Sequence, residues 1–75
     1  MIRLPTLNAR KVIAALKRAG FEETKQKGSH LYFWHPVWHM ETSVPIHGGE
    51  DLKRNLVRAI LQQAGLTEEQ FRELL

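Results

Sequence analysis

The stretch KGSHLYFWHP, residues 27–36, opens with a glycine–serine turn and continues as an aromatic, β-prone run. Side chains on a strand alternate between its two faces. His30, Tyr32 and Trp34 should therefore share one face of a strand that begins at residue 30. The opposite face should carry Leu31, Phe33 and His35.

The segments on either side of this stretch are also short and β-prone. FEETKQK (21–27) precedes the turn, and METSVPI (40–46) follows, with Thr42, Val44 and Ile46 on one face. Together the three segments predict an antiparallel three-stranded meander. Pro45 has no N–H group to donate to a neighbouring strand, so the third strand must lie at the sheet edge or end there.

Helical periodicity flanks the predicted sheet. Residues 8–20, NARKVIAALKRAG, predict a first helix that Asn8 caps and Gly20 ends. The apolar stripe of this helix is expected to contain Ala9, Val12, Ile13 and Leu16.

Two further helices are expected after the sheet. Residues 50–65, EDLKRNLVRAILQQAG, begin with acidic residues and end at Gly65, as is typical of a helix. Thr67 and Gln70 have the spacing of a capping box and predict a last short helix that carries Phe71. The apolar stripe of the second helix is expected to contain Leu52, Leu56, Ala59, Ile60 and Ala64.

The resulting order, α-β-β-β-α-α, predicts an α+β fold in a single domain that covers residues 1–75. Two amphipathic helices can cover one face of a three-stranded antiparallel sheet. The other face and its rim would then be available to bind a ligand.

Composition narrows the class of protein. The 75 residues include no cysteine, 11 Lys and Arg and 8 Asp and Glu, with a formal charge of +3. Without cysteine, disulfides and thiolate zinc sites are excluded. No apolar stretch approaches the roughly 18 residues that a membrane span needs, so the sequence predicts a soluble cytoplasmic protein with no membrane partner. The excess positive charge permits a polyanionic partner.

His30 has two interpretations. It can be a structural residue that begins a strand and bonds its ring nitrogens to backbone or water. Alternatively it can transfer protons, because an unperturbed imidazole has a pKa of about 6.5. Gly28 permits the close approach of a ligand and Ser29 offers a hydroxyl. Lys25 and Lys27 bring positive charge to the same turn, which would attract a phosphate.

Other basic side chains could hold an RNA backbone collectively, although singly most such residues merely solvate a surface. They lie off the apolar stripes of the first and second predicted helices. These further RNA-binding candidates are Arg10, Lys17, Lys53, Arg54 and Arg58.

The remaining histidines and Trp38 allow several roles. His47, before two glycines, is either a loop residue or a second proton carrier or phosphate contact. His35 and His39 would share a helical face, but Pro36 separates them in an expected hairpin connection. No local carboxylate completes a metal-binding set, so we expect no metal and no cofactor. Trp38, at the tip of that connection, could stack on a base or, as we prefer, contact a protein partner.

The segments GFEETKQKGSHLYFWHP and SVPIHGGEDLKRNLVRAILQQAGLTEEQF resemble the HicA toxins of prokaryotic toxin–antitoxin systems. The likeness rests on a Gly-Ser-His step, a later Val-Pro-x-His-x-Gly step and an Arg-x-Ile-Leu-x-Gln-x-Gly helix end, in matching order and spacing. The resemblance implies a fold like that of double-stranded-RNA-binding domains, endoribonuclease activity on messenger RNA, and neutralisation by a HicB-like antitoxin. It assigns the catalytic histidine to His30, with Gly28 and Ser29 as motif neighbours, and matches His47 to the histidine of the later step.

The leading hypothesis from the sequence is therefore a toxin that acts as a metal-independent endoribonuclease, with His30 as general acid or base. Two alternatives belong to other classes. The same fold can bind RNA through its shape and backbone without cutting it, or the chain can serve only to dock onto another protein.

Overall fold

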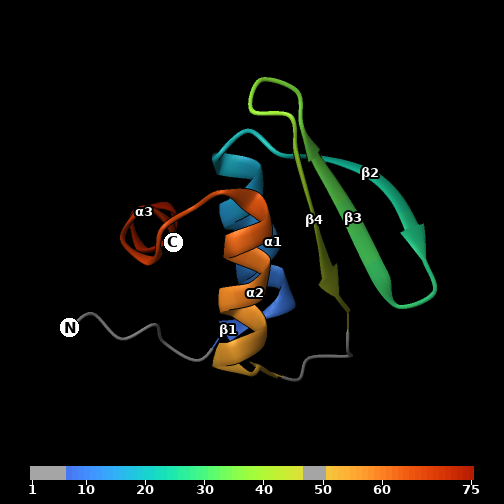
Figure 1. The fold of residues 1–75 in the computed structure, drawn as a ribbon. Helices are drawn as coiled ribbons and strands as arrows, with labels where there is room; N and C mark the ends of the chain where they lie inside the picture. Colours follow the sequence, from blue (N-terminus) through green and yellow to red (C-terminus); the bar gives the residue numbers. More distant parts are fainter. Residues whose placement is uncertain (1–6, 47–50) are drawn as a thin grey trace.

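The computed structural model describes residues 7–46 and 51–75 and has mixed α+β architecture (Figure 1). The α-β-β-β-α order that the sequence predicts is confirmed, with a further short helix at the end. The elements in chain order are β1 (Leu7–Asn8), α1 (Ala9–Arg18), β2 (Glu22–Lys27), β3 (His30–His35), β4 (Met40–Pro45), β5 (Asp51–Leu52), α2 (Arg54–Ala64) and α3 (Glu68–Leu74).

The main sheet is an antiparallel meander with strand order β2-β3-β4. The predicted alternation of β3 is confirmed, because His30 and Trp34 are exposed and Tyr32 is half-buried, while every other residue of the strand is buried. β4 is an edge strand and ends at Pro45, as the missing N–H group of proline requires. The buried residues of β3 are Leu31, Phe33 and His35.

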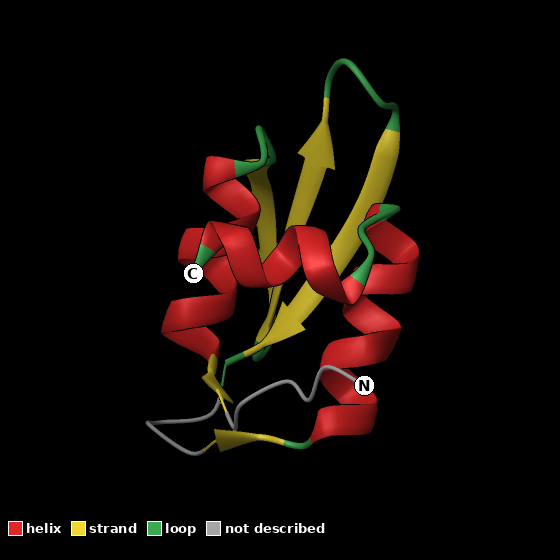
Figure 2. Ribbon diagram, turned by 90° about the vertical axis from the view of Figure 1, so that its left-hand side faces the viewer, coloured by secondary structure: helices red, strands yellow, loops and turns green. Residues whose placement is uncertain are grey.

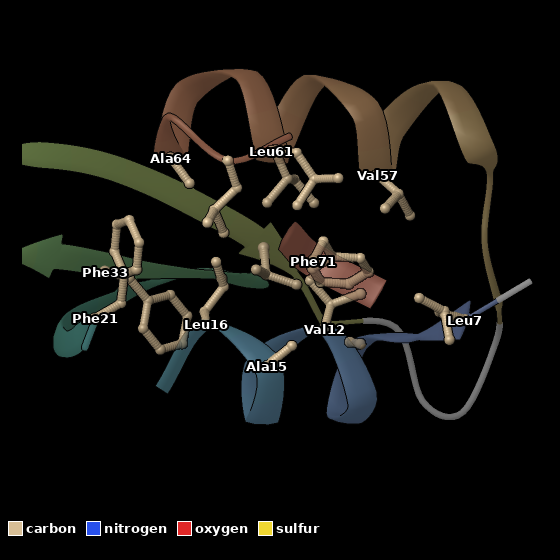
Figure 3. Packing of buried hydrophobic residues seen from close by; sticks show 14 of the residues in the cluster. Leu7, Val12, Ala15, Leu16, Phe21, Phe33, Val57, Leu61, Ala64 and Phe71 are labelled. Atoms are coloured by element: carbon tan, nitrogen blue, oxygen red, sulfur yellow. The ribbon is translucent and has the colours of Figure 1, made fainter. Parts of the chain in front are cut away.

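The helices cover one face of this sheet. Seen from the helical side, α3 crosses in front of α1 and α2, and the three strands lie behind them (Figure 2). Phe71 of α3 reaches into the space between α1 and α2 and is fully buried (Figure 3). Phe33 of β3 and Leu16 of α1 are also fully buried, so one apolar core joins the sheet to the helices.

The predicted helix ends are also observed. The Asn8 side chain accepts a hydrogen bond from the Lys11 backbone N–H at 3.0 Å, which caps α1. Gly65 ends α2 in the left-handed conformation with φ of 75°. Thr67 and Gln70 form both hydrogen bonds of the capping box at the start of α3.

Two expectations at the start of the second helix are wrong. α2 begins only at Arg54, and Leu52 instead lies in β5, where it pairs with Leu7 of β1. The stripe is also rotated, because Leu56 is 37% exposed and Ala59 is exposed. The residues that α2 buries are Val57, Ile60, Leu61 and Ala64, which follow the spacing i, i+3, i+4, i+7.

No helix in the two described ranges is both long enough and apolar enough to cross a membrane.

Candidate functional site

His30 begins β3, and its side chain is exposed on the face of the sheet opposite the helices. Its register partners are Lys27 in β2 and Pro45 in β4. Directly opposite residues of antiparallel strands point to the same face. The imidazole therefore lies beside the Lys27 side chain at the end of the sheet, and none of the hydrogen bonds between described residues involves its ring.

The turn before His30 is a two-residue hairpin loop formed by Gly28 and Ser29. Gly28 has φ of +61°, and a Cβ added there would meet no atom within 4 Å. Glycine at the first turn position with positive φ is typical of a type II′ hairpin. The Ser29 carbonyl accepts a hydrogen bond from the Ile46 backbone N–H at 2.6 Å, which ties the turn to the chain that leaves β4.

The surface opposite the helices, which we name the open face, gathers polar and aromatic side chains around His30. Lys25 and Tyr32 are register partners, and the Lys25 Nζ atom lies 5.0 Å from the centroid of the Tyr32 ring. This distance is typical of a cation–π contact. A cation and an aromatic ring therefore occupy the row next to that of Lys27 and His30.

The other basic candidates lie on the helical layer. Arg10 is in the first turn of α1, and Arg54 is the first residue of α2. Both helices begin at the end of the molecule where β4 ends and β3 starts (Figure 1). Lys53 precedes Arg54 and shares that end, so three basic side chains lie at the His30 end of the molecule but on another layer.

Two basic candidates are placed less favourably. Lys17 lies in the last turn of α1, close to the Ala19 carbonyl that contacts the far end of β3. Arg58 forms an ion pair with Glu68 at an Nε–Oε1 distance of 2.8 Å. The structure therefore does not bring Lys17 or Arg58 together with His30.

This geometry can be compared with known proteins. The description "HicA toxin of bacterial toxin-antitoxin" belongs to a family model that matches residues 9–66, from the start of α1 to the residue after Gly65. The chain belongs to the HicA toxin family. Members of this family are the toxins of toxin–antitoxin systems. A search of curated proteins gives no match.

His35 of this HicA-family chain has a structural role. Its Nε2 atom lies 2.8 Å from the Ala19 carbonyl oxygen, which can only accept, so Nε2 carries the proton. Its Nδ1 atom accepts hydrogen bonds from the backbone N–H groups of Val37 and Trp38 at 3.2 and 3.0 Å. Both ring nitrogens are therefore used to fasten the β3–β4 loop to the end of α1.

Trp38 contributes to the same structural cluster. Its ring stacks on the His35 imidazole, with centroids 4.0 Å apart and planes 2° apart, and forms a T-shaped contact with the Phe21 ring. The side chain is nevertheless 45% exposed at the predicted hairpin tip. Trp38 thus packs within the HicA-family fold, and its contact with a partner protein stays a prediction.

His47 lies outside the residues that the structure describes, so its role as a second proton carrier stays a prediction from the sequence. Among residues 7–46 and 51–75, no group of three or more His, Cys, Asp or Glu side chains could hold a metal ion. Of the two histidines that the sequence singles out as proton carriers, His30 is the one whose surroundings the structure describes.

Sequence reasoning missed a polar hollow of about 360 Å³ at the outer edge of β4. The alternation of METSVP contains a signal for it, because Glu41 and Ser43 fall on the face opposite Thr42 and Val44. The contribution of α2 has no such signal, since Gln63 reaches β4 only through the tertiary fold. The lining residues are Tyr32, Glu41, Thr42, Ser43 and Gln63.

Proposed function

We propose that this HicA-family toxin cleaves messenger RNA in the cytoplasm as a metal-independent endoribonuclease, with His30 as general acid or base. The observation that carries the proposal is the exposed His30 side chain at the end of the open face, in register with Lys27. A structural histidine in this fold looks different, because His35 is buried and uses both ring nitrogens in hydrogen bonds.

The chemistry requires few protein groups because RNA supplies its own nucleophile. In our proposal the imidazole of His30 takes the proton of a ribose 2′-hydroxyl, and the 2′-oxygen attacks the adjacent phosphorus. The bond from phosphorus to the 5′-oxygen breaks, and that oxygen receives a proton from the protonated imidazole or from a second carrier. The products are a 2′,3′-cyclic phosphate and a 5′-hydroxyl end.

Lys25 and Lys27 have the chemistry to stabilise this reaction. Cations that lie where negative charge develops on a phosphoryl group lower the barrier of its transfer. Both lysines share the open face with His30, and both are exposed. Gly28 leaves space above the turn, because a Cβ there would meet nothing within 4 Å. We also propose His47 as the second proton carrier, on the chemistry of its imidazole and on its place in the sequence before two glycines.

An antitoxin is the expected protein partner, since the family belongs to toxin–antitoxin systems. We propose a HicB-like protein that covers His30 and the two lysines of the open face. Covering these groups would block both proton transfer and phosphate binding. This mode of inhibition needs no change in the conformation of the toxin.

The direct test is His30→Ala in purified protein, assayed on RNA in EDTA. Positioned acid–base catalysis contributes about 10²–10⁴-fold, so we expect a loss of at least about 100-fold in the cleavage rate. The matched control is His39→Asn, which removes another exposed histidine whose φ of 57° Asn tolerates. The control should cleave like the wild type.

Three outcomes would contradict the proposal. His30→Ala could cleave at the wild-type rate, EDTA could stop cleavage by the wild type, or the products could carry 3′-hydroxyl instead of cyclic phosphate ends. Binding of RNA that stays intact with the wild type would favour the RNA-binding module. Growth of cells that express each version then reports whether cleavage underlies toxicity.

A further inference from the structure

The polar hollow at the edge of β4 is not used by the proposed cleavage chemistry. Its volume of about 360 Å³ falls at the lower end of the range of about 300–1,000 Å³ for small-molecule sites. One wall comes from Tyr32 of β3, another from β4, and a third from Gln63 of α2. All five lining residues are polar or amphipathic, and none of them is Lys or Arg.

The hollow lies near His30 along the sheet. Tyr32 and Ser43 are register partners and therefore point to the open face, as His30 does. Tyr32 is two residues beyond His30 in β3, which corresponds to about 7 Å along a strand. β4 is the last strand of the sheet, so the hollow opens at an edge. A single strand of RNA with a phosphate at His30 can therefore place a neighbouring base there.

The hydrogen bonds of Thr42 decide which acceptor the inner wall of the hollow offers to a ligand. The Thr42 hydroxyl lies 3.1 Å from the Ile60 carbonyl oxygen and 3.2 Å from the Gln63 Oε1 position. A hydroxyl has one proton, and a carbonyl can only accept, so Thr42 donates to Ile60. The second contact is then satisfied when the Gln63 amide is turned so that its nitrogen donates to Thr42. The Gln63 oxygen is left as an acceptor for a ligand.

Glu41 adds a carboxylate to the hollow on the open face. It is exposed, and within the described ranges the ion pair that forms is Arg58–Glu68, not one with Glu41. A carboxylate repels the phosphates that the lysines would attract. It is, however, a strong acceptor for the N–H groups of a base, and a pair of such groups can bind it in bidentate fashion.

We propose that the hollow binds guanine from the nucleotide next to the cleaved phosphodiester, which makes Glu41 a specificity-determining residue. Guanine is the RNA base whose Watson–Crick edge places two adjacent N–H donors beside one oxygen acceptor. The Glu41 carboxylate accepts from the two donors, and a hydroxyl of Tyr32 or Ser43 donates to the oxygen. Uracil, cytosine and adenine each present one donor group there and lose the bidentate contact. This inference rests on the proposed function for the identity of its ligand class, RNA.

The first test is nucleotide binding, which does not depend on cleavage. GMP, AMP, CMP and UMP are titrated separately into ¹⁵N-labelled protein, and the backbone amide shifts of residues 41–43 and 63 are followed. We expect GMP to shift these amides and the other three nucleotides to bind at least about tenfold more weakly. Equal binding of all four nucleotides, or shifts confined to the lysines of β2, would overturn the proposal.

The matched variants are Glu41→Gln and Glu22→Gln. Glu22 and Glu41 are both register partners of Trp34, so they flank the same ring on the same face, but Glu22 does not line the hollow. Both variants remove one negative charge. Only Glu41→Gln should lose the preference for GMP, and loss of the preference in both variants would overturn the inference.

Mapping of cleavage sites separates this inference from the proposed function. If RNA is cut, wild type and Glu22→Gln should cut next to guanine, and Glu41→Gln should cut with at least about tenfold less preference. Cutting without base preference, together with no GMP binding, leaves the nuclease proposal intact and overturns the guanine site. Selective GMP binding without any cutting would support the guanine site and overturn the nuclease proposal.

Discussion

Two histidines of β3 lie at opposite ends of the strand and meet opposite surroundings. The positions of His30 and His35 differ by an odd number, so the alternation of the strand directs the two side chains to different faces. His35 is 5% exposed and stands between the Ala19 carbonyl and the backbone of the β3–β4 loop. His30 is exposed beside Lys27. The same residue type therefore serves stability at one end and, in our proposal, proton transfer at the other.

The backbone at Gly20 lies in close contact with the His35 ring. Gly20 has φ of +107°, and a Cβ there would lie 2.7 Å from the His35 Nε2 atom. The backbone at this position can approach the imidazole only because glycine has no side chain. The two residues together set how α1 turns into β2.

We expect His35→Ala to lower the free energy of unfolding by about 3 kcal/mol, because it leaves three partly buried backbone groups without their partner and creates a cavity. Urea unfolding followed by circular dichroism measures the change. His39→Asn is the control, since His39 is exposed and its stacking on Trp34 lies at the surface. A loss for His35→Ala no larger than that of the control would contradict the structural role.

β3 and α2 differ in how far a local sequence pattern determines them. The alternation of β3 is local and strong, so the buried and exposed faces of this strand follow from the residues alone. The start of α2 depends on a pairing between Leu7 and Leu52, which are distant in the chain. Such short paired strands have no periodicity of their own, and the sequence therefore assigns Leu52 to the helix.

The candidate site also combines features that the sequence predicts with features that it does not. The position of His30 on the open face follows from strand alternation, and so does its nearness to the lysines of β2. The sequence does not predict that Arg58 lies apart from His30. Its ion pair with Glu68 joins two helices whose packing no local pattern specifies. The hollow at β4 likewise needs Gln63 of α2 beside Thr42.

The structure and the sequence pattern assign different residues to the buried stripe of α2, and two substitutions can test which assignment is right. Val57 is 1% exposed, and Val57→Ala should lower the free energy of unfolding by about 2 kcal/mol, since it removes two buried carbon atoms and leaves a cavity. Leu56 is 37% exposed, and Leu56→Ala should cost less than about 1 kcal/mol although it removes more atoms. Urea unfolding of both variants provides the comparison. The reverse order of the two costs would support the stripe expected from the sequence.

Positive charge is divided between the open face and the helical layer of the protein. Lys25 and Lys27 stand beside His30, whereas Lys17 and Arg72 belong to α1 and α3, on the opposite side of the sheet. Net charge alone attracts RNA from any direction. Only contacts with phosphates release bound counterions, so the salt dependence of binding reports which lysines touch the RNA.

The salt dependence of RNA binding should therefore distinguish position from net charge. The double variants Lys25→Gln/Lys27→Gln and Lys17→Gln/Arg72→Gln each remove two positive charges, and fluorescence anisotropy can measure their affinity for a single-stranded RNA in the His30→Ala background. Each phosphate contact with a single strand contributes about 0.7 to the slope of log affinity against log salt. The parent should give a slope of about −3 if about four contacts form, the first double variant should reduce its magnitude by about 1.4, and the second should leave it unchanged. Equal reductions of the slope in both double variants would mean that RNA binds through overall charge. They would contradict the proposal that the lysines of the open face bind the phosphate next to His30.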